Sequence, residues 1–85
     1  MTTELSTKYD SRKSFYGKAR VETSSTTGEV YLVSYQTKVA SIHDSIAIVY
    51  DTYSATTLRH IKEFLRQNGF KAENSKQIMK DYGVK

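Results

Sequence analysis

Three cationic side chains between residues 54 and 70 have the spacing of a binding surface. Arg59, Lys62 and Arg66 recur every three or four residues, and in an α-helix they fall within roughly 60° of one another. Guanidinium and ammonium groups on one helix face can neutralise successive phosphates and release the counterions held there. This basic stripe predicts binding to nucleic acid. The alternative is a solvated helix face on which Arg59 pairs with Glu63, four residues further on.

A second group of cations alternates with an aromatic residue nearer the start of the chain. Tyr16, Lys18 and Arg20 lie two residues apart, so in a β-strand they share one face. Tyr31 or Tyr35 of the next predicted strand would join them. Rings that stack on bases, beside cations that contact phosphates, form a platform for single-stranded nucleic acid. The alternative is that these residues occupy a solvent face for their β-propensity alone. The RNP pattern of RRM domains is absent from the sequence.

The sequence predicts neither an enzyme nor a cofactor or metal site. His43 falls in a predicted turn and His60 on the polar part of a predicted helix. His60 and Glu63 are three residues apart and within reach of each other in a helix, but no third ligand or nucleophile accompanies them. The sequence contains no HExxH, Gly-rich phosphate loop or GxSxG motif. It also contains no Cys, so it offers neither a thiolate ligand nor a disulfide.

Length and charge limit the class of protein. The chain of 85 residues is enough for one small domain, and its 13 basic and 9 acidic residues give a net charge of +4. This mild excess is compatible with nucleic acid or an acidic protein as partner, and equally with an ordinary surface. No apolar run approaches the length of about 20 residues that spans a membrane. The polar N-terminus lacks the apolar core of a signal peptide. We therefore expect a cytoplasmic protein that does not enter membranes.

The first half of the domain has the pattern of a small sheet. Residues 1–13 show no periodicity and are predicted to form a flexible polar tail, followed by a single small α+β domain over residues 14–85. Alternation of apolar and polar residues predicts strands over residues 15–22 and 29–35. Residues 37–42 either form a further strand or continue the second strand as one long bent strand. Unbroken alternation, and the absence of Gly, Asn or Asp at Gln36, favour the long strand.

The second half has the pattern of helices. After a turn at residues 43–45, the almost entirely apolar segment 46–50 is predicted to be the best-buried strand. Ser54 is the expected N-cap of a long helix that ends at Gly69. A shorter helix, with Ser75 as its expected cap, ends at Gly83.

The expected fold is therefore α+β, with an antiparallel sheet of three to four strands followed by one long and one short helix packed on one face. The exposed edges of so small a sheet also predict association of the chain with itself. The predicted core consists of Phe15, Ala19, Val21, Leu32 or Val33, Val39, Ile46, Ile48, Leu58, Ile61, Phe64 and Leu65.

The segments SFYGKARV, SYQTKVASI and YSATTLRHIKEFLRQNGF resemble a family of small uncharacterised proteins encoded by phages and mobile elements of Gram-positive bacteria. The resemblance covers roughly residues 14–83. It implies a small accessory protein that acts in the cytoplasm of a bacterial host cell. Such proteins typically bind DNA, or bind and inhibit a host polymerase, nuclease or CRISPR effector. The most specific run is Ser-x-Thr-Thr-x-Arg-His-Ile-x-Glu-Phe-Leu, formed here by Ser54, Thr56, Thr57, Arg59, His60, Ile61, Glu63, Phe64 and Leu65.

Two functional hypotheses follow. The first is a non-enzymatic, basic module that binds nucleic acid, or a host nucleoprotein, without a cofactor. The second is a host-directed inhibitor that binds a protein such as a CRISPR effector, nuclease or polymerase. The net positive charge argues against an acidic mimic of DNA. The residues expected to bind nucleic acid or a partner are Arg59, Lys62, Arg66, Lys18, Arg20 and Tyr16.

Overall fold

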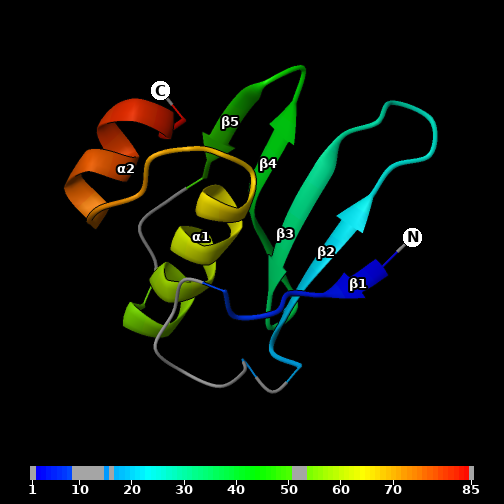
Figure 1. The fold of residues 1–85 in the computed structure, drawn as a ribbon, viewed down its shortest axis with the longest axis horizontal. Helices are drawn as coiled ribbons and strands as arrows, with labels where there is room; N and C mark the ends of the chain where they lie inside the picture. The colour runs from blue at the N-terminus through cyan, green and yellow to red at the C-terminus, as the bar shows by residue number, and fades with distance from the viewer. Residues whose placement is uncertain (1, 9–14, 16, 51–53, 85) are drawn as a thin grey trace.

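The computed structural model describes residues 2–8, 15, 17–50 and 54–84, and these form a sheet followed by two helices. The strands are β1 (Thr2–Glu4), β2 (Ala19–Thr23), β3 (Val30–Ser34), β4 (Thr37–His43) and β5 (Ile46–Val49). They lie in the order β1-β2-β3-β4-β5, and each neighbouring pair is antiparallel. Figure 1 shows α1 (Ala55–Gln67) lying against this sheet and α2 (Ser75–Tyr82) beside β5. The predicted α+β class is confirmed, but the sheet has five strands rather than three to four.

The additional strand comes from the segment predicted to be a polar tail. Thr2–Glu4 pairs with β2, with Thr2 opposite Glu22 and Glu4 opposite Arg20. Leu5 follows directly and is buried in the core, and its N–H donates to the carbonyl of Ala19 at 3.0 Å. A single apolar residue has no periodicity, which is why the sequence pattern missed this segment. Residues 9–13 of the predicted tail lie outside the described residues.

The favoured long strand over residues 29–42 is wrong, because the chain turns between β3 and β4. Tyr35 adopts a positive φ of 59° at this turn. Its N–H donates to the carbonyl of Lys18 at 2.7 Å, and its carbonyl accepts from the guanidinium of Arg20 at 3.2 Å. The turn is thus held by hydrogen bonds to residues 18 and 20 rather than by a turn-forming residue of its own.

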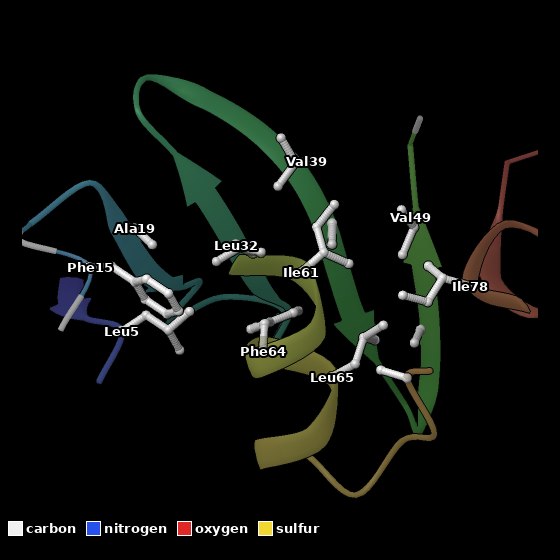
Figure 2. Close-up of a cluster of buried hydrophobic side chains, with 13 residues drawn as sticks. Leu5, Phe15, Ala19, Leu32, Val39, Val49, Ile61, Phe64, Leu65 and Ile78 are labelled. Atoms are coloured by element: carbon white, nitrogen blue, oxygen red, sulfur yellow. The ribbon is translucent and has the colours of Figure 1, made fainter. Parts of the chain in front are cut away.

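One hydrophobic core joins the sheet to both helices (Figure 2). Ile61, Phe64 and Leu65 of α1 are fully buried in it, as predicted, and α2 contributes Ile78. Leu32 and Val33 are both buried, whereas Val21 and Leu58 are only partly buried. The cluster of buried side chains consists of Leu5, Phe15, Ala19, Leu32, Val39, Ala40, Ala47, Val49, Ile61, Phe64, Leu65, Ala72 and Ile78.

The prediction that residues 46–50 form the best-buried strand is wrong. Ala47 and Val49 are buried, but Ile46 is 63% exposed and Ile48 is 38% exposed. The reason is that successive side chains of a strand point to opposite faces, and only one face of β5 contributes to the core. Beyond β5, the N–H of Val84 donates to the carbonyl of Val49 at 3.1 Å, so the end of the chain covers part of this sheet edge.

The helix ends follow local capping chemistry. Ser54 is the N-cap of α1, as predicted, and its hydroxyl oxygen accepts from the N–H of Thr57 at 3.3 Å. Gly69 follows the C-cap with a φ of 84°. The N-cap of α2 is Asn74 rather than the predicted Ser75: the side-chain oxygen of Asn74 accepts from the N–H of Gln77 at 2.8 Å, and Ser75 is the first residue of the helix. Gly83 ends α2 in an extended conformation, where a Cβ would collide with the carbonyl of Met79.

Candidate functional site

The basic stripe lies along one side of α1. Arg59, Lys62 and Arg66 are all partly exposed. The guanidinium of Arg66 donates to the carbonyl of Ala72, in the link between α1 and α2. Because a carbonyl carries no net charge, Arg66 keeps its positive charge while it also holds the link in place. Lys62 makes neither a hydrogen bond nor an ion pair with the described residues. The stripe therefore includes at least one cation, Lys62, that is partly exposed and makes no contact of this kind within the described residues.

Glu63 is not part of this exposed side of α1. The residue is only 1% exposed. One of its oxygens accepts from the backbone N–H of Lys8 at 3.0 Å, and the other accepts from the side-chain amide of Gln67 at 2.6 Å. Gln67 also donates to the carbonyl of Ser6 at 2.7 Å. The negative charge of Glu63 thus serves to anchor the segment after β1 to the helix.

The second helix adds cations that were not among the residues predicted to bind a partner. Lys76 and Lys80 are exposed, and they lie four residues apart on α2. Lys71 is also exposed and pairs with Glu73, with 3.7 Å between Nζ and Oε1. The (i, i+4) spacing of the two α2 lysines is a signal that could have found them. A shallow groove over α2 is lined by Lys71, Asn74, Lys76, Gln77, Lys80 and Asp81.

The positive charge is concentrated in the helical half of the protein. Residues 54–84 contain six Lys and Arg residues against three Asp and Glu residues, whereas residues 17–50 contain three of each. One of the three acids in the helical half is the buried Glu63. The excess of cations is therefore a property of α1, α2 and their link, and not of the sheet.

Lys18 and Arg20, the cations predicted for the first strand, lie at β2 and not on α1. Lys18 is exposed, just before β2. Arg20 is bound on two sides, with its Nε 3.3 Å from Oε2 of Glu22 and its terminal nitrogen donating to the carbonyl of Tyr35. Tyr16 lies outside the described residues. No hydrogen bond or ion pair described in the structure joins Lys18 or Arg20 to the basic stripe of α1.

On the neighbouring strand β3, the ring of Tyr31 offers little open surface on which a base could stack. The ammonium group of Lys38 lies 4.0 Å from the ring centroid of Tyr31, an arrangement in which the ring already interacts with a cation. The phenol of Tyr31 donates to the carboxylate of Glu29. This hydrogen bond, with further contributions from burial and from the negative charge of Glu29, raises the pKa of Tyr31 above its usual 10.0. A base that stacked on Tyr31 would have to displace Lys38.

A buried polar cluster joins β3 to α1. His60 is 1% exposed, and its Nδ1 lies 2.7 Å from the hydroxyl oxygen of Ser34. That oxygen is also 3.1 Å from the hydroxyl of Thr57. The ring of His60 packs edge-on against Phe15, with 4.5 Å between centroids. Ser34 and His60 are a nucleophile and a base by type, but a substrate cannot reach atoms so deeply buried, so the pair is structural.

The placement of His60 on a polar helix side is therefore wrong. The available signal was its position three residues after Thr57 and four before Phe64, which puts it between two inward-facing residues. His43, in contrast, is exposed, with its Nε2 3.1 Å from the carbonyl of Thr27. Within residues 2–8, 15, 17–50 and 54–84, no three metal-binding side chains come together.

Comparison with known proteins identifies a family but no activity. Residues 3–81 match the model of a family of unknown function (DUF8033). No curated protein and no solved structure matches the chain. The match agrees with the expected membership of an uncharacterised family, while the phage or Gram-positive setting stays a prediction. Among the described residues, no helix is long and apolar enough to cross a membrane.

Proposed function

The chain belongs to the family of unknown function DUF8033, and we propose that it is a non-enzymatic accessory protein of a phage or mobile element that binds nucleic acid in the bacterial cytoplasm. The observation that carries this proposal is the excess of six cations over three acids in the helical half. Lys62, Arg59 and Arg66 project from one helix, and each can neutralise a phosphate and release a counterion.

The basic stripe is the centre of the proposed site. Arg66 contributes a charge to this site, but it also supports the link through its hydrogen bond to the carbonyl of Ala72. Lys62 has no such structural duty and is the residue to change first. Lys18 and Arg20 belong to the proposed site only as outlying contacts, since the charge of Arg20 is already paired with Glu22.

The direct test is fluorescence anisotropy with labelled DNA at two salt concentrations. We expect binding that weakens as salt rises, because contacts to phosphate release counterions. Lys62→Ala should weaken binding to all sequences and reduce the salt slope by about 1. Lys38→Ala is the matched control, because it removes the same charge from β4, where Lys38 is engaged with Tyr31. Binding that is absent, or that does not respond to salt, would rule the proposal out.

A second candidate function, a host-directed inhibitor, is favoured by one observation. Ile46, Ile48 and Tyr50 at the β5 edge are large apolar residues with exposed side chains, which is common at surfaces that bind proteins. Under this alternative the partner is a bacterial polymerase, nuclease or CRISPR effector. Inhibition assays on purified enzymes of these classes would test it. An inhibition that survives Lys62→Ala but is lost in Ile46→Ser would favour the inhibitor over the nucleic-acid-binding module.

A further inference from the structure

We infer that α1 and α2 together bind the phosphate backbone of a double-stranded nucleic acid, with Lys76 and Lys80 of α2 as contacts in addition to Lys62 and Arg59 of α1. This inference rests on the proposed function and specifies its ligand. Four features of the described structure support it. The cations of α1 and α2 have no exposed ring on their helices, and the link between these helices is fixed. The groove on α2 contains more lysines than acids, and Tyr31 and Arg20 of the sheet are already engaged with other residues.

Within the described structure, the cations of α1 and α2 have no exposed aromatic ring on their own helices. Among residues 2–8, 15, 17–50 and 54–84, the large apolar or aromatic residues with exposed side chains are Tyr35, Ile46, Ile48, Tyr50 and Val84, and none of them belongs to α1 or α2. Binding of a single strand draws much of its affinity from bases stacked on rings beside cations. A surface of cations without exposed rings contacts phosphates alone, and a duplex presents its phosphates on the outside while its bases stay stacked.

The aromatic rings of residues 54–84 are either buried or packed against other parts of the protein. Phe64 is fully buried. Phe70 and Tyr82 pack edge to face, with 5.8 Å between ring centroids, and the phenol of Tyr82 donates to the carbonyl of Lys71 at 2.8 Å. Both rings also pack against the hydrophobic core. Stacking a base on either ring would therefore require opening the contact between the link and α2.

The link between the helices runs from the end of α1 to the start of α2 (Figure 1), and several side chains hold it in place. Arg66 of α1 donates to the carbonyl of Ala72. Gln77 of α2 accepts from the N–H of Glu73 at 2.8 Å and donates to the carbonyl of Lys71 at 3.3 Å. These bonds fix the start of α2 relative to the end of α1. Lys62 and the α2 lysines are thus presented as a constant pattern, which suits a regular array of phosphates.

The groove on α2 has the composition of a phosphate contact. Lys76 and Lys80 are exposed and make no ion pair with the described residues. One carboxylate, that of Asp81, lines the same groove and accepts from the side-chain amide of Gln77 at 2.8 Å. Since the lysines outnumber this acid, the groove keeps a positive charge.

The sheet offers a poorer site for a single strand. Tyr31 is covered by Lys38, and Arg20 is paired with Glu22. The exposed Tyr35 lies beside Lys18, but Arg20 is committed to the carbonyl of Tyr35. Tyr31 and Arg20, which would belong to a stacking platform on β2 and β3, are thus already engaged with other residues of the sheet.

The test compares three labelled ligands of matched sequence and length: duplex DNA, duplex RNA and single-stranded DNA. We expect at least one duplex to bind about tenfold more tightly than the single strand at equal salt, because its phosphates are more densely spaced. Contacts from Arg59, Lys62, Lys76 and Lys80 predict a logarithmic salt slope of about −4 for duplex DNA. The double variant Lys76→Ala/Lys80→Ala should make that slope shallower by about 2 units, and Lys38→Ala should leave it unchanged.

The outcomes separate this inference from the proposed function. A single strand that binds as tightly as both duplexes overturns the inference and leaves the proposed function standing. Duplex binding that is unchanged in Lys76→Ala/Lys80→Ala also overturns it, because α2 then takes no part. Failure of all three ligands to bind removes the proposed function and the inference together. A urea denaturation curve for each variant shows whether a loss of binding is merely a loss of folding.

Discussion

The hydroxyl oxygen of Ser34 lies 2.7 Å from Nδ1 of His60, so a buried hydrogen bond connects the last residue of β3 to the second turn of α1. Tyr35, the next residue along the chain, turns into β4 with a positive φ and places its ring 6.0 Å from that of His60. The helix therefore meets the sheet through a polar contact as well as through the apolar core. Removing this contact with Ser34→Ala should therefore cost stability.

Ser34→Ala should lower the free energy of unfolding by about 1–3 kcal/mol, because it removes a buried partner from His60 and from Thr57. Urea denaturation followed by circular dichroism measures the loss. Ser41→Ala is the matched control, since Ser41 is equally buried but bonds the phenol of Tyr50, which is exposed and can turn to water. An equal loss of unfolding free energy in both variants would show that the Ser34–His60 hydrogen bond contributes no more to stability than the Ser41–Tyr50 hydrogen bond.

Glu63→Gln should also destabilise the fold, by about 1–3 kcal/mol, because an amide cannot accept two hydrogen bonds in the way a carboxylate does. The N–H of Lys8 and the side chain of Gln67 both donate to this carboxylate. Glu73→Gln provides a control with the same change in charge at an exposed site, and its effect should stay within about 0.5 kcal/mol. If Glu63→Gln unfolds at the same urea concentration as the parent protein, the anchoring role assigned to Glu63 is wrong.

Ser45→Gly should stabilise the protein by about 0.5–1 kcal/mol, because Ser45 occupies the left-handed region that glycine adopts without steric cost. Asp44 and Ser45 have φ values of 51° and 65° in the turn between β4 and β5. Thermal unfolding would report the gain as a higher Tm. Ser25→Gly is the control, because Ser25 is an exposed loop serine outside the set with positive φ. It should give no gain.

Tyr31 should titrate above the usual 10.0 because its phenol donates to Glu29, and Glu29→Gln should bring its pKa back down. A raised pKa means that the folded protein holds this proton more tightly than the unfolded chain does. The associated stability is therefore present below about pH 10 and is lost as the pH rises through the pKa of the folded state. Assigned NMR signals of labelled tyrosine rings would follow the titration. A Tyr31 that titrates at the same pH in both proteins would contradict the assigned cause.

The sequence by itself determined the parts of this protein that depend on neighbours in the chain. The apolar positions Ile61, Phe64 and Leu65 recur at helical spacing, and Ser54 caps the backbone only three residues ahead of it. The hydrophobic side of α1, the spacing of the basic stripe and the approximate positions of β2, β3 and β5 could therefore be read from local patterns. The concentration of charge in the helical half is likewise a matter of counting along the chain.

Only the tertiary structure decided the features that depend on distant partners. Leu5 is buried because β1 adds to the edge of β2, and Tyr35 turns because Lys18 and Arg20 hold its backbone. His60 is buried because Ser34 satisfies it from another element. These outcomes could not follow from periodicity, since a polar or isolated residue is buried only where a partner from elsewhere in the chain compensates the loss of water.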